Sequence, residues 1–118
     1  MSKNQIKIDD LIGKDYKKKG RGPDSFDCYG LCMEVSKRFG IKLPKMHNLI
    51  RHKFISLDKP EPAALVLIET ENTRHIGIMI DKKSLLQVNS LGRRGVHKIR
   101  INHPWIKDRI VGYYKYVG

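Results

Sequence analysis

The chain has 118 residues and a formal net charge of +12. This length supports a single domain, residues 1–118, which can bury roughly two-thirds of its unfolded surface. No run of 18 apolar residues is present, which excludes a transmembrane helix. The excess of positive charge predicts an anionic partner or a negatively charged working surface.

The N-terminal segment contains no secretory signal. Its first ten residues, MSKNQIKIDD, lack both an apolar core and a small-residue cleavage site. We therefore expect the protein to be made in the cytoplasm without a signal peptide. Ile8, Leu11 and Ile12 share one helical face before a glycine, which predicts a short first helix over residues 6–13. The lysine-rich stretch that follows is expected to be a loop.

Residues 24–40 predict the main helix. Ser25 and Asp27 are both suitable N-cap residues, and either would place Cys28 in the first turn. Unpaired backbone N–H groups and the helix dipole would there lower the thiol pKa and favour the thiolate. The alternative is an inert, buried cysteine. The helix is indicated by an apolar stripe at helical spacing: Phe26, Cys28, Leu31, Cys32, Val35 and Phe39.

The two cysteines do not indicate a metal centre or a disulfide framework. Cys28 and Cys32 are four residues apart on the same predicted helix, and no histidine or further cysteine lies near them. We therefore expect both thiols to be reduced. The next segment, residues 41–54, fits a second helix only weakly, and its His47 and His52 are expected at the surface.

From Ala63 onward the chain predicts strands. A near-continuous apolar run is followed by strictly alternating and β-rich segments with turn residues between them. Helices first and strands afterwards indicate an α+β domain, with a five-stranded antiparallel meander. The expected strands cover residues 63–69, 73–81, 84–90, 96–101 and 110–117.

His75 is the second residue of chemical interest. It lies on a predicted strand with isoleucines on the opposite face, and it shares its own face with Gly77, which permits close approach of another backbone. An ordinary hydrogen-bonded, half-buried histidine is one interpretation. Together with a cysteine at a helix N-terminus, His75 suggests a thiol–imidazole pair that could perform nucleophilic catalysis.

Several stretches resemble the NlpC-type family of papain-like cysteine peptidases. GKDYKKKGRGPDSFDCYGL is similar to the motif around the family's catalytic cysteine, which has a tyrosine, a Gly-rich loop and then Phe-Asp-Cys, a variable residue, Gly and Leu. RHIGIMID resembles the family's histidine strand and SLLQVNS the strand after it. HPWIKDRIVGYYKYVG resembles the C-terminal strand of the branch found in phage tails and prophages. The resemblance covers residues 10–117.

The resemblance implies a role for four residues. Cys28 would be the nucleophile and His75 the general base. Gln87 aligns with the third catalytic position, which is usually a histidine, and Tyr16 aligns with a tyrosine whose hydroxyl helps to hold the substrate or the oxyanion. The chain departs from the family where Ala63-Ala64 replaces Gly-Asp and where Tyr29 replaces the commoner Ser after the cysteine.

The partner of His75 depends on the register of the following hairpin. A loop centred on Asp81 places Gln87 directly across from His75. A loop centred one residue later, on Lys82, instead brings Asn89 near the imidazole. The family alignment selects Gln87, which would fix the tautomer and orientation of the ring.

The implied fold is a papain-like α+β domain with N-terminal helices, the catalytic cysteine at a helix N-terminus, and a five-stranded antiparallel sheet. The implied activity is hydrolysis of peptide bonds in peptidoglycan stem peptides through a thioester, without a metal or organic cofactor. The protein would act at the bacterial cell wall as a free enzyme or as a virion or prophage component. Its partners would be peptidoglycan, anionic teichoic acids and phage tail proteins.

Two alternatives remain from the sequence. The first is an inactive peptidase fold that serves as a wall-binding or phage-tail component. The second is a basic nucleic-acid-binding domain without catalysis, supported by the charge and by a C-terminal strand rich in Tyr, Lys and Arg. No helix-turn-helix, RNA-recognition or zinc-finger signature accompanies that charge, so nucleic acid is not the expected partner.

Overall fold

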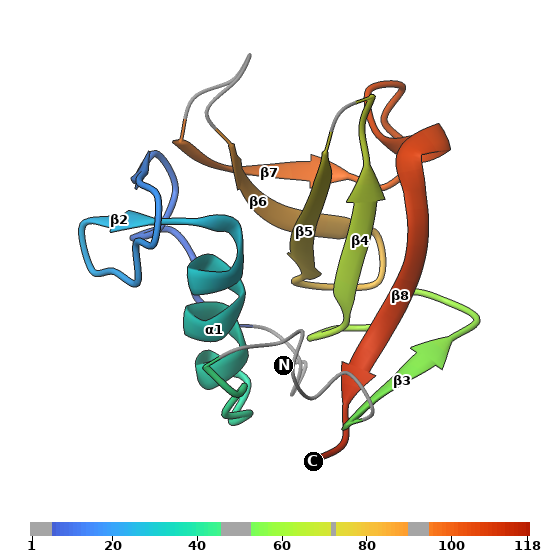
Figure 1. The fold of residues 1–118 in the computed structure, drawn as a ribbon, viewed down its shortest axis with the longest axis horizontal. Helices are drawn as coiled ribbons and strands as arrows, with labels where there is room; N and C mark the ends of the chain where they lie inside the picture. The colour runs from blue at the N-terminus through green and yellow to red at the C-terminus, as the bar shows by residue number, and fades with distance from the viewer. Residues whose placement is uncertain (1–5, 46–52, 72, 90–94) are drawn as a thin grey trace.

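The computed structural model describes residues 6–45, 53–71, 73–89 and 95–118. In this part of the chain, one α-helix lies beside a six-stranded antiparallel sheet, and a two-stranded parallel sheet precedes the helix (Figure 1). In chain order the elements are β1 (Asp15–Tyr16), β2 (Ser25–Phe26), α1 (Cys28–Arg38), β3 (Phe54–Leu57), β4 (Leu65–Glu69), β5 (Arg74–Met79), β6 (Ser84–Asn89), β7 (Gly95–Arg100), the 3-10 helix η3 (Lys107–Arg109) and β8 (Ile110–Tyr116).

The strand order in the large sheet is β3-β8-β4-β5-β6-β7. The five strands expected from the sequence correspond to β4 through β8, but the expected five-stranded meander is wrong. Only β4 to β7 follow one another in space, because the chain after β7 returns across the sheet and β8 pairs with the other side of β4. β3 is a sixth strand, which pairs with β8 at the edge of the sheet.

The additional strand β3 has no clear sequence signal. Ile55 and Ser56 are exposed, whereas Phe54 and Leu57 are half-buried, so apolar and polar residues do not alternate. The predicted second helix over residues 41–54 is not seen in residues 41–45. At its other end the prediction is wrong, since Phe54 begins β3. Residues 46–52, with His47 and His52, lie outside the described residues.

The predicted first helix over residues 6–13 is also wrong. The segment forms turns, in which Leu11 N–H donates to Ile8 O and Lys14 N–H donates to Leu11 O. Gly13 has a φ of +87° and donates its N–H to Val96 O of β7, so the chain leaves the segment toward the sheet. A single apolar turn is too short to form a stable helix, and Leu11 is buried in the core instead.

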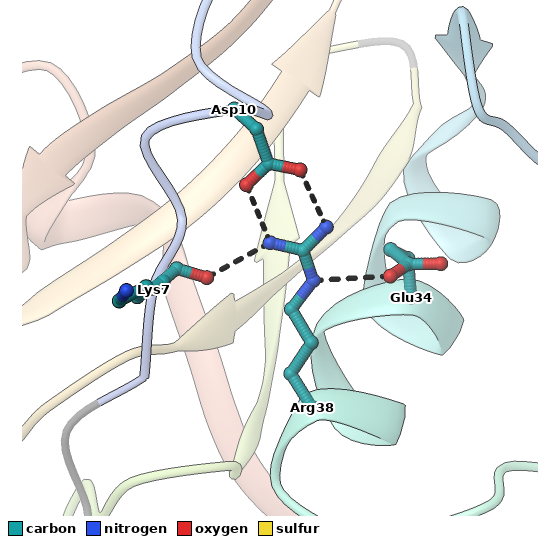
Figure 2. A network of polar contacts seen from close by, with 4 residues as sticks. All are labelled: Lys7, Asp10, Glu34 and Arg38. Atoms are coloured by element: carbon teal, nitrogen blue, oxygen red, sulfur yellow. Dashed lines mark hydrogen bonds and ion pairs between the residues drawn. The ribbon is translucent and has the colours of Figure 1, made fainter.

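Arg38, at the C-terminal end of α1, holds this N-terminal segment against the helix. Its guanidinium group donates to both carboxylate oxygens of Asp10 at 2.7 Å, to the Lys7 carbonyl oxygen at 2.8 Å and to Glu34 at 3.0 Å (Figure 2). The hydrogen bond from Arg38 lowers the pKa of Asp10. The segment is therefore tied to α1 by one side chain and to β7 by backbone contacts.

The core has two parts, one on each face of the sheet. On one face, α1 packs against β5 and β6 (Figure 1), and Leu31 and Val35 of the helix join Ile78 and Leu86 of the strands. On the other face, alternate strand residues pack with a residue from the loop before η3. The buried members of this second cluster are Ala64, Val66, Ile68, Met79, Leu85, Ile99 and Ile106. Among the described residues, no helix is long and apolar enough to span a membrane.

Candidate active site

The N-terminus of α1 is organised by one carboxylate. Asp27 is the N-cap residue, with extended backbone, and its Oδ1 accepts the Gly30 N–H at 2.6 Å. The same oxygen accepts a hydrogen bond from Arg21 Nη1 at 2.6 Å. One of the two expected cap residues therefore caps the helix, and Cys28 is the first helical residue, as predicted.

Gly30 lets the preceding loop reach the first turn of the helix. A Cβ atom at this position would lie 2.1 Å from Gly20 O, a separation that no side chain can occupy. The loop is held there because Asp27 N–H donates to Gly20 O at 3.0 Å. Only a glycine fits at position 30, because the Gly20 carbonyl occupies the space of a side chain there and brings the loop next to the first turn that holds Cys28.

Burial controls the ionisation of Cys28. It raises the pKa of the thiol above the usual 9.0, and the nearby Asp27 carboxylate raises it further. The backbone N–H of Ile76 acts in the opposite direction, as do N–H groups of the first helical turn. The N–H groups of the helix N-terminus thus lower the pKa as expected, but burial outweighs them, so the expected net decrease in the thiol pKa is wrong. Cys32 is fully buried, and its pKa is raised well above 9.0.

The thiol lies where β5 and β6 separate. These strands pair at Ile78↔Leu86 and Met79↔Leu85, and no further pairs between them are formed in the described structure. A backbone hydrogen bond from Ile76, two residues before the first pair, lowers the pKa of the Cys28 thiol. Cys28 is thus placed beside the residue that follows His75.

The hairpin between β5 and β6 is centred on Lys82, so the predicted register centred on Asp81 is wrong. Ile80 N–H donates to Ser84 O, and Asp81 Oδ1 accepts the backbone N–H groups of Lys83 and Ser84 at 2.8 and 2.7 Å. These two hydrogen bonds close an Asx-type turn, which shifts the centre of the loop by one residue.

His75 and Gln87 are nevertheless in contact. His75 Nε2 lies 2.9 Å from Gln87 Oε1. Gly77 lies between the two residues on this face, and β6 approaches it closely: a Cβ added there would lie 3.0 Å from Leu85 Cδ1 and 3.1 Å from Leu86 O. The side chain of the alternative partner, Asn89, lies outside the described residues.

A third side chain continues this contact and was missed from the sequence. His97 of β7 pairs with Gln87 of β6, and its Nε2 lies 3.1 Å from Gln87 Nε2. His97 Nδ1 lies 3.0 Å from Gly95 O. Gln87 and His97 are 4% and 7% exposed, so bulk water does not replace these contacts. The turn between the two strands gave no clear register, and without a register the pairing of Gln87 with His97 could not be predicted.

The surroundings of His75 keep its ring neutral. Burial lowers the pKa of the imidazole below the usual 6.5, while the hydrogen bond to Gln87 raises it and His97 lowers it. In this structure no hydrogen bond joins Cys28 to the His75 ring within the described part of the chain. Catalytic hydrogen bonds are often long without substrate and shorten when it binds.

Two tyrosines lie near the cysteine and differ in their surroundings. Tyr16 is 39% exposed and pairs with Phe26, two residues before Cys28, through the parallel β1–β2 bridge. Tyr29 is buried, and its hydroxyl donates to Pro44 O. Burial raises the pKa of Tyr29 to about 12. The residue after the cysteine therefore anchors the chain beyond α1, whereas the Tyr16 ring faces solvent.

The described residues contain no group of three or more His, Cys, Asp or Glu side chains that could hold a metal ion. The basic residues Lys17, Lys18 and Lys19, which precede the helix, are exposed. Lys98 and Arg100 of β7 are exposed as well. The positive charge therefore lies on the outside of the site.

Comparisons with known proteins identify the fold and the family. Solved structures share the fold. NlpC2 from Trichomonas vaginalis is 18% identical, with a TM-score of 0.71, and the match covers 90% of this chain and 43% of that protein. An NlpC/P60 family protein from Bacillus cereus is 22% identical, with a TM-score of 0.70 and coverages of 99% and 43%, and a lipoprotein-like NLP/P60 family protein from Staphylococcus aureus is 19% identical, with a TM-score of 0.68 and coverages of 98% and 42%. The chain thus spans less than half the length of these proteins. No curated protein matches the sequence. Residues 13–115 match the model of the NlpC/P60 family, and the chain belongs to this family.

Proposed function

We propose that this chain is a cysteine peptidase that hydrolyses peptide bonds in bacterial peptidoglycan stem peptides. Members of the NlpC/P60 family are generally cysteine peptidases or cell-wall hydrolases. The single observation that carries the proposal is the hydrogen bond between His75 Nε2 and Gln87 Oε1, on the strand that adjoins Cys28. This contact fixes the orientation of the imidazole beside the thiol, as general-base catalysis requires.

In the proposed mechanism His75 is the general base. Because Nε2 donates its proton to Gln87, the lone pair of the neutral ring is on Nδ1. Nδ1 takes the proton of the Cys28 thiol as the sulfur attacks the carbonyl carbon of the substrate. The imidazolium then donates this proton to the leaving amine, and the C–N bond breaks to leave a thioester. Water attacks the thioester, with His75 again accepting a proton, and the thiol is restored.

The negative oxygen formed during attack needs donors that are already in place. The backbone N–H of Cys28, the first residue of α1, is one candidate, because it has no partner within the helix. The Tyr16 hydroxyl is the proposed second donor, since Tyr16 lies beside the short strand that leads to Cys28. These two roles extend the proposal to the residues around the nucleophile.

The exposed lysines and arginines have a separate proposed role. They would hold the protein on an anionic cell wall, for example through teichoic-acid phosphates, and would not take part in bond cleavage. Wall binding should therefore weaken steeply between low and physiological salt, while turnover of a small neutral stem peptide should barely change. Tighter binding to DNA or RNA than to cell walls would support the nucleic-acid alternative. A phage-tail or prophage origin remains a prediction.

The decisive experiment is digestion of purified peptidoglycan, with the fragments identified by mass. We expect the wild-type chain to release stem-peptide fragments and Cys28→Ala to release none while keeping its fold. Cys32→Ala is the matched control, since this thiol is fully buried in the core and should not take part. Iodoacetamide should modify Cys28 far faster than Cys32. Wall binding without fragments would indicate an inactive binding component, and unchanged cleavage by Cys28→Ala would exclude Cys28 as the nucleophile.

A further inference from the structure

Three side chains on neighbouring strands form one hydrogen-bonded chain that ends on a backbone carbonyl. It runs from His75 on β5 through Gln87 on β6 to His97 on β7, and His97 ends it at Gly95 O. We infer that His97 is a positioning residue: it sets the direction of the Gln87 amide and thereby the tautomer of His75. This inference rests on the proposed function, in which His75 is the base.

The direction of each hydrogen bond follows from the last group in the chain. A carbonyl oxygen can only accept, so His97 Nδ1 must carry the proton that it donates to Gly95 O at 3.0 Å. The Gln87 atom 3.1 Å from His97 Nε2 is the amide nitrogen, and an NH₂ group only donates. His97 Nε2 must therefore accept, which a ring with its single proton on Nδ1 can do.

The same logic fixes the other end. With its NH₂ group turned toward His97, Gln87 has only its oxygen to offer to His75. The ring nitrogen of His75 at 2.9 Å from that oxygen must therefore carry a proton. This leaves the lone pair on Nδ1, which is the form that can accept a proton from the thiol.

A glutamine at this position needs such guidance because its two ends are almost equal in shape. If the amide were turned around, its NH₂ group would face His75 Nε2, and the ring would have to carry its proton on Nδ1. That tautomer cannot take the Cys28 proton through Nδ1. Burial of Gln87 and His97 prevents water from satisfying the reversed arrangement, since these side chains are only 4% and 7% exposed.

The backbone around the Gly95 carbonyl, which accepts from His97 Nδ1, is itself held in place. Val96 N–H donates to Lys14 O, and Gly13 N–H donates to Val96 O, both at 2.8 Å. Gly95 has a φ of +79°, and a Cβ there would lie 2.8 Å from Lys14 O. The N-terminal turn thus fixes the backbone that gives the hydrogen-bonded chain its direction.

The test compares His97→Phe, which keeps a ring but has no acceptor, with His97→Gln, whose NH₂ group can donate to Gly95 O so that its oxygen accepts from Gln87. His103→Phe is the matched control, because His103 belongs to the turn after β7 and makes no contact with the His75–Gln87–His97 hydrogen bonds. The main readout is the tautomer of His75 in the free protein, from its ring ¹⁵N shifts. We expect only Nε2–H in the wild type and in His103→Phe, a mixture in His97→Phe, and recovery in His97→Gln.

A second comparison separates positioning from packing. A carboxylate only accepts, so Gln87→Glu needs no direction from position 97. In that background, His97→Phe should leave the His75 tautomer unchanged. With a peptide substrate, His97→Phe alone should lower kcat about 3- to 10-fold at unchanged KM, less than the ~100-fold of a complete general-base loss.

The ¹⁵N readout needs no turnover, so it tests the inference even if the chain proves inactive. A single Nε2–H tautomer in His97→Phe would overturn the role of His97 and leave the proposed peptidase intact. A mixture that persists in the Gln87→Glu background would also overturn it, because the effect would then come from packing. Loss of all cleavage by the wild type, with the expected tautomers, would overturn the proposed function alone.

Discussion

The two halves of the site are built in different ways. On the helix side, Cys28 is positioned by backbone groups and by the capped first turn, and burial keeps its thiol protonated. On the sheet side, His75 is oriented by a buried chain of side chains. From this difference we infer that His75, the base, is aligned before substrate binds, and that Cys28, the nucleophile, loses its proton only during attack. A stored thiolate–imidazolium pair does not fit this arrangement, since burial disfavours both ions.

The largest effect is expected on the helix side, from Gly30→Ala. The new methyl group would overlap Gly20 O, so the loop or the first helical turn must move. A displacement of about 1 Å beside the nucleophile can cost ~100-fold in activity, and overpacking costs about 1–3 kcal/mol of stability. The measurements are kcat/KM on a stem peptide and thermal unfolding.

Ser36→Ala on the same helix is the control for Gly30→Ala. Ser36 is buried, and its hydroxyl has no hydrogen-bond partner in the described structure, so its removal should not weaken folding or activity. Full activity in Gly30→Ala would show that the helix side tolerates displacement and that the close approach of the loop is not needed.

The next effect is expected on the sheet side, from Gln87→Ala. Without the amide, the His75 ring loses its acceptor but keeps its basic nitrogen, so kcat should fall about 10- to 100-fold, no more than the lower end of general acid–base contributions. Alkylation of Cys28 by iodoacetamide should remain detectable, because the helix side is unchanged. An equal loss of alkylation and turnover would mean that the two halves of the site are not separate.

The pH dependence of activity and of alkylation compares the two halves of the site directly, although the expected effects are smaller. His75 has a pKa below 6.5, so it stays neutral and able to accept a proton to lower pH than an ordinary histidine. The acid limb of kcat/KM should therefore lie below pH 6.5. Cys28 has a pKa above 9.0, so its alkylation rate should keep rising beyond pH 9. A rate already constant at pH 7 would reveal a preformed thiolate and contradict the comparison. In Gln87→Ala the acid limb should move lower still, because the hydrogen bond to Gln87 raises the His75 pKa.

The smallest effect is expected at Ala63, where the sheet side carries strain. Ala63 has a φ of +72°, in the left-handed region that favours glycine, and it precedes β4, whose N-terminal end pairs with β5. Ala63→Gly should raise the free energy of unfolding by about 0.5–1 kcal/mol, after the greater freedom of glycine in the unfolded chain is subtracted. Chemical denaturation measures this change, and kcat should not change. A loss of stability would show that Ala63 is not strained.

The sequence was most informative where periodicity and capping agree. The helix that begins at Cys28 and the strands β4 to β8 were predicted, because a long apolar pattern fits the period of only one kind of secondary structure. The prediction of a helix over residues 6–13 was wrong, because the spacing of three apolar residues fits a single turn as well as a helix. β3 was missed because a half-exposed edge strand does not alternate.

The site was predicted less completely than the fold. The contact of Gln87 with His75 was expected, but from the family alignment and not from the hairpin, whose loop centre was wrong by one residue and whose pairing was therefore wrong by two. His97 was missed because its role depends on pairing between β6 and β7, which no local pattern specifies. The thiol pKa was misjudged since helix position is visible in a sequence and burial is not.

The position of β8 has a consequence for how the chain folds. β8 lies between β3 and β4, so the last strand in the sequence fills an interior place in the sheet (Figure 1). During synthesis, β3 has no neighbour in the sheet and one edge of β4 stays open until residues 110–116 have left the ribosome. Pairing strands so distant in sequence closes long loops and slows folding. We therefore expect the helix to form early in refolding, and the complete sheet, with its aligned histidine, to form in one later step when the C-terminal strand joins.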